Sequence, residues 1–218
     1  MTRTNDDIST DEAALRSAID EAVSDVIDAD SYWRAVDVVR SRGARAIWGR
    51  VASLASHEDP RVRSLVPDIL RYLGPERPFV EETLTLLRAM LSSESAPDVI
   101  ASIGEAFVDL DPPDAVALMR PFATHADARV RESVVHALLG NHDPLAIQTL
   151  IVLSRDPCDA VRDWATFGLG SQLGEPGEPS FVDTPEVRDA LAARLDDPDP
   201  DTRSEAIAGL ELRSDPRA

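Results

Sequence analysis

Few side chains in this sequence have the types and spacing that catalysis or metal binding requires. Cys158 is the only cysteine, so no intramolecular disulfide and no thiolate metal site can form. Three of the four histidines, His57, His125 and His142, fall in segments expected to be turns, where a solvated side chain is the simpler reading. No H-E-x-x-H, G-x-S-x-G or phosphate-loop motif occurs. The sequence therefore predicts no catalytic residue, no metal ligand and no cofactor.

One acidic segment, "LDDPDPDTRSE" (195–205), resembles a calcium-binding loop because its aspartates alternate. An EF-hand loop needs glycine at its sixth position and a bidentate glutamate at its twelfth. Thr202 and Ala208 occupy those positions here. A capped turn between two helices is the better interpretation.

The charge of the chain restricts its partners. The formal net charge is -18 over 218 residues, and all 22 basic residues are arginine. Such a chain repels nucleic acid and anionic membranes, and it either favours a basic partner or is simply kept soluble by its charge. No apolar run approaches the length of a membrane span, and "MTRTNDDIST" lacks the apolar core of a secretory signal. We expect a cytoplasmic protein that binds no membrane.

A repeated pattern organises most of the chain. Each copy reads acidic residue, short spacer, β-branched residue, arginine and then an apolar helical pattern. The clearest copies are "DPRVRSLVPDILRYLG" (59–74), "DARVRESVVHALLG" (127–140), "DAVRDWATFGLG" (159–170) and "DPDTRSEAIAGL" (199–210). A degenerate copy, "SAPDVIASIGEAFVDL" (95–110), has Ile100 in place of the arginine.

The copies are predicted to be helices. Apolar residues recur at the β-branched position and at +4, +7 and +8, which is one face of a helix. Aspartate before proline predicts an N-cap followed by a first-turn proline at three sites, Asp59-Pro60, Asp156-Pro157 and Asp199-Pro200. Gly170 is predicted to end its helix. A further helix is predicted before each copy, at 44–56, 79–92, 114–123, 145–154 and 184–195.

The predicted unit is thus a helical hairpin, and the fold class is all-α. We expect residues 44–218 to form one continuous solenoid domain of about five stacked hairpins. Two leading helices, 11–28 and 31–42, would make an N-terminal pair, residues 1–43, that caps the stack. The C-terminal "RSDPRA" resembles the start of another hairpin, as "NHDPLA" (141–146) does earlier. Either the last hairpin caps itself, or the chain continues, or a partner covers that end.

The skeleton D-x-x-V-R-x-x-A-x-x-A-L-G resembles the second helix of a bacterial HEAT repeat, best in "VRESVVHALLG" and "VRDWATFGLG". The resemblance implies a right-handed α-α superhelix whose second helices line the concave face. It also implies a ladder between neighbouring repeats, made by the arginine and the acidic residue before it. Four arginines match the ladder position, while Ile100 departs from it. They are Arg63, Arg131, Arg162 and Arg203.

If that geometry holds, the concave face is acidic and carries one aromatic pair, Trp164 and Phe167. Aromatic anchors surrounded by charge suit a protein or peptide partner. The alternatives are that the two rings pack on the insertion at 171–183 and that the acidic residues are a solvated face. The candidate partner-binding residues are Asp68, Glu105, Glu132, His136, Asp163, Trp164 and Phe167.

The sequence therefore predicts a non-enzymatic protein-protein interaction scaffold that binds a basic or amphipathic protein segment. A bacterial adaptor, immunity protein or regulatory protein fits this prediction. One alternative is an enzyme on a HEAT scaffold, of the phycobilin-lyase or DNA-glycosylase type. The glycosylases use a basic groove, which a charge of -18 fits poorly. Another alternative is an architectural segment of a larger assembly.

Overall fold

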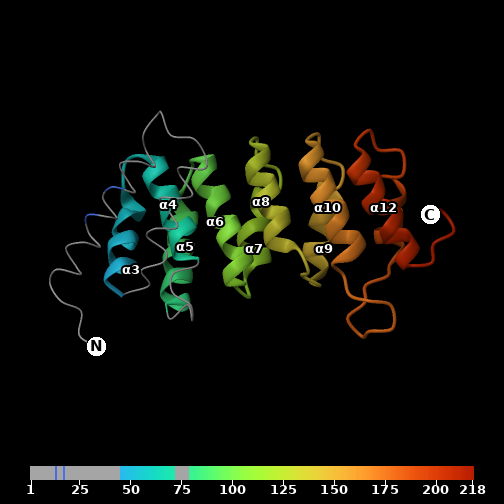
Figure 1. Ribbon diagram of the computed structural model, residues 1–218, viewed down its shortest axis with the longest axis horizontal. Helices are drawn as coiled ribbons and strands as arrows, with labels where there is room; N and C mark the ends of the chain where they lie inside the picture. The colour runs from blue at the N-terminus through green and yellow to red at the C-terminus, as the bar shows by residue number, and fades with distance from the viewer. Residues whose placement is uncertain (1–12, 14–16, 18–44, 72–78) are drawn as a thin grey trace. The chain divides into compact units, whose positions relative to one another are not determined.

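The computed structural model describes residues 13, 17, 45–71 and 79–218, and every regular element within them is a helix (Figure 1). The predicted N-terminal pair, residues 1–43, lies almost wholly outside the described residues. The chain divides into two compact units, 1–112 and 113–218, and each is described by itself. The single continuous domain predicted over 44–218 stays a prediction.

The first unit contains two of the predicted hairpins. Their second helices, α4 and α6, pack along each other. The elements are α3 (Arg45–Ala52), which continues into the 3-10 helix η1 (Ser53–Ser56), then α4 (Pro60–Leu70), α5 (Val80–Ser93) and α6 (Pro97–Leu110).

The second unit contains three hairpins. Helix α10 packs against α8 on one side and α12 on the other, so the three second helices form a row (Figure 1). The elements are α7 (Ala115–Met119), the 3-10 helix η2 (Arg120–Phe122), α8 (Ala128–Leu138), α9 (Pro144–Leu153), α10 (Asp159–Ser171), α11 (Pro185–Ala192) and α12 (Pro200–Leu212). The all-α hairpin architecture predicted from the repeat is confirmed.

Two of the three predicted aspartate caps, Asp59 and Asp199, are confirmed. An N-cap carboxylate accepts a backbone N–H of the first turn at Asp59, Asp127, Asp143 and Asp199. The predicted start at Asp156-Pro157 is wrong, because α10 begins at Asp159 with Cys158 as its N-cap. The Asp156 carboxylate accepts the Cys158 N–H from outside the helix, and both of its oxygens also accept hydrogen bonds from Arg131 of the preceding hairpin.

The predicted apolar stripe forms the core of both units. Val66, Val134, Ala165 and Ala206, the +4 residues of four copies, are all fully buried. Burying such side chains stabilises the fold by about 25 cal/mol per Å² of apolar surface removed from water.

The role predicted for Gly170 is wrong. It lies inside α10, and a Cβ built on it would meet the Glu205 carbonyl oxygen at 3.1 Å and the Gly209 Cα at 3.3 Å. These two glycines let α10 and α12 approach closely, whereas the helix itself continues to Ser171. Gly168 is a small packing residue, as predicted, with Leu139 and Leu150 against it.

Candidate functional site on the second helices

An arginine ladder joins successive hairpins within each unit. Each ladder arginine uses the two sides of its guanidinium differently. Nη1 donates to two backbone carbonyls of the loop before its own helix, and Nε and Nη2 donate to both oxygens of one carboxylate in the next hairpin. The pairs are Arg63–Glu94 in the first unit, and Arg131–Asp156 and Arg162–Asp197 in the second.

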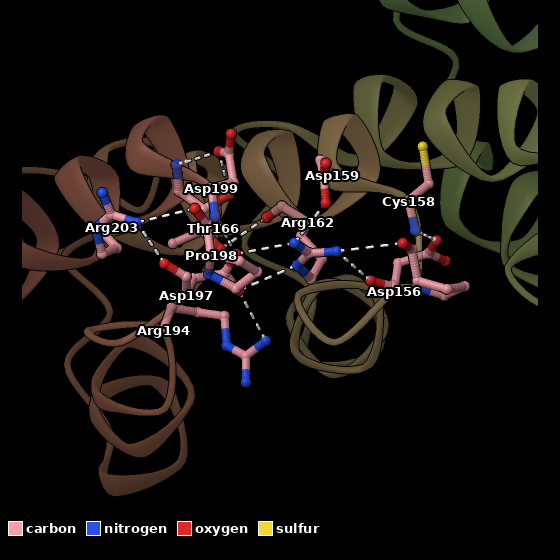
Figure 2. Close-up of polar contacts among 12 residues, drawn as sticks. Asp156, Cys158, Asp159, Arg162, Thr166, Arg194, Asp197, Pro198, Asp199 and Arg203 are labelled. Atoms are coloured by element: carbon pink, nitrogen blue, oxygen red, sulfur yellow. Dashed lines mark hydrogen bonds and ion pairs between the residues drawn. The ribbon is translucent and has the colours of Figure 1, made fainter.

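Figure 2 shows the most buried of these pairs, Arg162 with Asp197. The Nε and Nη2 atoms of Arg162 lie 3.1 and 2.9 Å from the Asp197 oxygens, and only 8% and 2% of the two side chains are exposed. Asp197 also accepts the Asp199 N–H, and Arg194 reaches it at 3.2 Å. The hydrogen bond from Arg162 holds the pKa of Asp197 below its usual value, although burial opposes the shift.

The carboxylates of the other two ladder pairs, Glu94 and Asp156, also have lowered pKa values. Hydrogen bonds from Arg63 lower the pKa of Glu94 to about 2, against an opposing effect of burial. At Asp156 burial raises the pKa, but the hydrogen bonds from Arg131 and from the Cys158 N–H outweigh it and lower the pKa overall. Each ladder carboxylate is therefore an anion that its neighbours stabilise.

The acidic members of the ladder are not the residues that the motif suggested. The motif's acid lies at or just after the helix start, whereas the ladder acid stands two residues before the N-cap. The sequence does carry a signal, because Asp156 and Asp197 lie six residues before Arg162 and Arg203. His125 fills the same place before Arg131, and its Nδ1 accepts the Asp127 N–H in the same way. His125 thus replaces the acid in the copy at 127–140. The copy before it has Ile100 in place of the ladder arginine, so no arginine there requires a carboxylate partner.

An aromatic cluster lies on the second helices of the second unit. Trp164 on α10 is 38% exposed, and its ring meets the edge of His136 from α8 at a centroid distance of 4.9 Å. Phe167 meets Trp164 in a T-shaped contact at 5.7 Å. Three predicted site residues are therefore brought together, and one of them presents its ring to solvent.

The insertion at 171–183 has a different centre, Arg213, which the sequence did not indicate. The buried Arg213 guanidinium donates to carbonyls at the ends of α10 and α12 and to the Val182 carbonyl. Phe181 lies over this guanidinium at 5.3 Å, and the Val182 N–H donates to Leu173. The Trp164 ring instead contacts the rings of His136 and Phe167.

Two carboxylates on the second helices, Asp163 on α10 and Glu205 on α12, are half-buried and have raised pKa values. The pKa of Asp163 is raised mainly by burial and to a smaller extent by the nearby charges of Asp199 and Asp201. The pKa of Glu205 is likewise raised mainly by burial, and then by the charges of Asp163 and Asp201. The Oδ1 atom of Asp163 is buried and accepts no hydrogen bond from the described residues. A cation placed between these two carboxylates would favour their ionised forms and so lower both pKa values.

The remaining predicted face residues lie on α8 and in the first unit. Glu132 lies half-buried on α8. Asp68 and Glu105 belong to the first unit, where both line a groove of about 420 Å³ between α4 and α6, together with Asp98 and Arg71. Asp68 is only 4% exposed, so it contributes charge to this groove rather than surface.

The first helices of the second unit border a larger hollow that the sequence did not reveal. It has a volume of about 840 Å³ and lies between α7 with η2 and α9. Val152 and Leu145 expose apolar surface there, and Arg120 contributes a positive charge.

The described residues contain no group of three or more His, Cys, Asp or Glu side chains arranged to hold a metal ion. No helix among them is both long enough and apolar enough to cross a membrane.

The comparisons with known proteins agree on the fold. Residues 84–170 match the family model of HEAT repeats. Protein YibA of Escherichia coli K12 is 33% identical over 88 residues, which are 40% of this chain and 29% of YibA, so the match spans less than a third of that relative. The X-ray structure of the E. coli YibA protein superposes with a TM-score of 0.76 at 19% identity, covering all of this chain and 78% of the other. A designed armadillo repeat protein, solved in complex with the peptide (KR)4, gives a TM-score of 0.53 at 15% identity over 91% of this chain and 98% of its own. The chain is thus similar to HEAT and armadillo repeat proteins and has their all-helical repeat fold.

Proposed function

We propose that this protein is a non-catalytic interaction module of the cytoplasm that binds a basic protein segment. The binding surface would be the second-helix face of residues 113–218. Its centre would be the aromatic cluster His136–Trp164–Phe167 together with Asp163 and Glu205, named below the acidic-aromatic face.

One observation carries the proposal. Asp163 keeps a buried carboxylate oxygen without a hydrogen bond, next to a second carboxylate with a raised pKa and an exposed tryptophan ring. An arginine or lysine of a partner would donate to Asp163 and Glu205 and place its charge against Trp164, where a cation–π contact contributes about 0.5–2 kcal/mol. The bound cation would also lower both pKa values, so binding would release protons where these groups are partly protonated.

The fold and the net charge support the same class of partner. The designed armadillo repeat protein in complex with (KR)4 demonstrates that stacked helical repeats can hold an alternating Lys-Arg peptide. The charge of -18 attracts such a peptide at long range and speeds its association. The acidic groove between α4 and α6, with Asp68 and Glu105, would add to this field.

Titration calorimetry with the peptide (KR)4 at physiological salt tests the proposal. We expect binding by the whole chain and a loss of about 5- to 50-fold in affinity for Trp164→Ala and for Asp163→Asn. The matched control is Glu186→Gln, which removes one exposed carboxylate from the first helix α11. It changes the net charge by the same amount as Asp163→Asn, and we expect less than a twofold effect.

Equal losses in Asp163→Asn and Glu186→Gln would mean that only net charge attracts the peptide, and the acidic-aromatic face would be rejected. Circular dichroism of each variant verifies that the helices are intact before binding is compared.

A further inference from the structure

The hollow between α7 with η2 and α9 exists because the first helix of its hairpin is short. Helix α7 has five residues, whereas α9 has ten. Pro121 follows α7 closely and lacks the N–H that a continuing α-helix would need, so the helix gives way to the 3-10 turn η2. Part of the α9 flank is therefore left uncovered, and it borders a hollow of about 840 Å³.

The hollow does not arise from an end of the chain. It lies between two consecutive hairpins, α7–α8 and α9–α10, and the hairpin α11–α12 follows them in the same unit. Helix α9 also packs against α11, so its contact with the next hairpin is already made. A hairpin added after α12 would extend the row of helices and would leave the space between α7 and α9 open.

The middle of the hollow is apolar. Leu145 and Val152 lie seven residues apart on one side of α9, and they are 43% and 59% exposed. Val116 and Ala117 line the wall formed by α7. Apolar residues spaced in this way on two neighbouring helices can accept the apolar stripe of a third helix.

The charged residues of the hollow lie towards its two ends. The ladder pair Arg131–Asp156 joins the N-terminal ends of α8 and α10, so these two helices run in the same direction. Helices α7 and α9 each precede one of them in a hairpin, and they therefore run in the same direction as each other. The N-cap residues Asp114 and Asp143 thus lie at one end of the hollow, and Arg120, which follows α7, lies at the other.

We propose that this hollow docks an amphipathic helix of a partner protein, with a basic N-terminal end and an acidic C-terminal end. The apolar stripe of that helix lies against Leu145 and Val152. Its basic side chains lie beside Asp114 and Asp143, and its acidic side chains pair with Arg120. The positive N-terminal end of the helix dipole also faces the two aspartates, so the dipole and the side chains favour the same direction of binding.

Charge argues against the two occupants that this chain itself could supply. The predicted helix 11–28 starts with Asp11 and Glu12, and the predicted helix 31–42 ends with Arg40 and Arg42. Each of them would therefore bring a like charge to one end of the hollow. A second copy of the chain carries the same net charge of -18 and is repelled at long range.

Two synthetic peptides of equal composition and zero net charge test the proposal on the full chain. Each has about 12 residues, an apolar helical stripe and a chemical staple that holds it helical. The forward peptide has two arginines in its first turn and two glutamates in its last turn, and the reversed peptide has them exchanged. Fluorescence anisotropy should give an affinity at least about 5-fold higher for the forward peptide, and Arg120→Gln should reduce that ratio by about half.

The apolar contact is tested with a pair of matched variants. Val152→Asp should lower the affinity for the forward peptide at least about 10-fold, because it places a charge against the apolar stripe. Val108→Asp is the same change at an exposed valine of α6 in the first unit, and it should alter the affinity by less than about 2-fold. Circular dichroism verifies that both variants are folded.

Equal affinities for the two peptides, or equal effects of the two valine variants, would overturn the proposal. Absence of binding would overturn it as well, because the hollow would then be closed to a partner helix by this chain itself. Self-association measured by sedimentation equilibrium and abolished by Val152→Asp would assign the hollow to a second copy, and the partner helix would be rejected. None of these results affects the proposal for the acidic-aromatic face, which lies on the second helices and is tested with (KR)4.

Discussion

Asp197 in the arginine ladder and Asp163 on the acidic-aromatic face are both shielded from water, yet their pKa values shift in opposite directions. Asp197 receives hydrogen bonds from Arg162 and from a backbone N–H, so its charge is favoured where it lies. Asp163 has burial and two neighbouring aspartates acting on it, and one of its oxygens has no donor. The charged pairs of the ladder stabilise the contact between hairpins. The carboxylates of the acidic-aromatic face lower the stability of the fold, as charged groups in binding sites often do.

The largest expected effect is at the buried ladder pair. Arg162→Met should lower the free energy of unfolding by about 3–5 kcal/mol, because it leaves the Asp197 charge buried without its main partner. Urea denaturation measures the change. Arg129→Met is the matched control, since Arg129 pairs with Asp127 at the surface and should contribute less than about 1 kcal/mol. Similar losses for both variants would contradict the distinction between ladder and surface pairs.

An intermediate effect, with a defined pH dependence, is expected for Glu94→Gln. The pKa of Glu94 is about 2 in the folded protein against an ordinary value of 4.5, so folding favours the ionised form. Its contribution is complete above about pH 4.5 and is lost as the pH falls towards 2. The variant should therefore be less stable by about 2 kcal/mol at pH 7 and should approach the wild type near pH 2. Urea denaturation at a series of pH values checks this, and a gap that does not change with pH would refute it.

The smallest effect has the opposite sign and is expected for Asp163→Asn. Because the folded pKa of Asp163 is raised, its ionised form destabilises the fold, and stability improves as the pH falls through that pKa. Removing the charge should raise the free energy of unfolding by roughly 0.5 kcal/mol at pH 7, and the gain should vanish on acidification. Asp197→Asn, the same chemical change in the ladder, should destabilise the protein. Destabilisation by both variants would erase the difference between the two regions.

The sequence by itself determined the repeat, the hairpins and most of the core stripe. These follow from local patterns, since a 3.6-residue apolar period and aspartate caps act within one helix. The five predicted second helices and the helices before them all occur in the described residues. The alignment of the copies also singled out Trp164 and Phe167 as the residues that are special to their copy.

The tertiary structure decided what each repeat presents to its neighbours. Asp156 reads as a helix cap in sequence, but it stands outside α10 and binds Arg131 of the preceding hairpin. Gly170 reads as a helix end, but it is the point where α10 meets Gly209 of α12. The proximity of Asp163 to Glu205 likewise depends on the packing of two helices. A local pattern specifies which face of a helix is apolar, but only the stacking of hairpins specifies which partner each polar group finds.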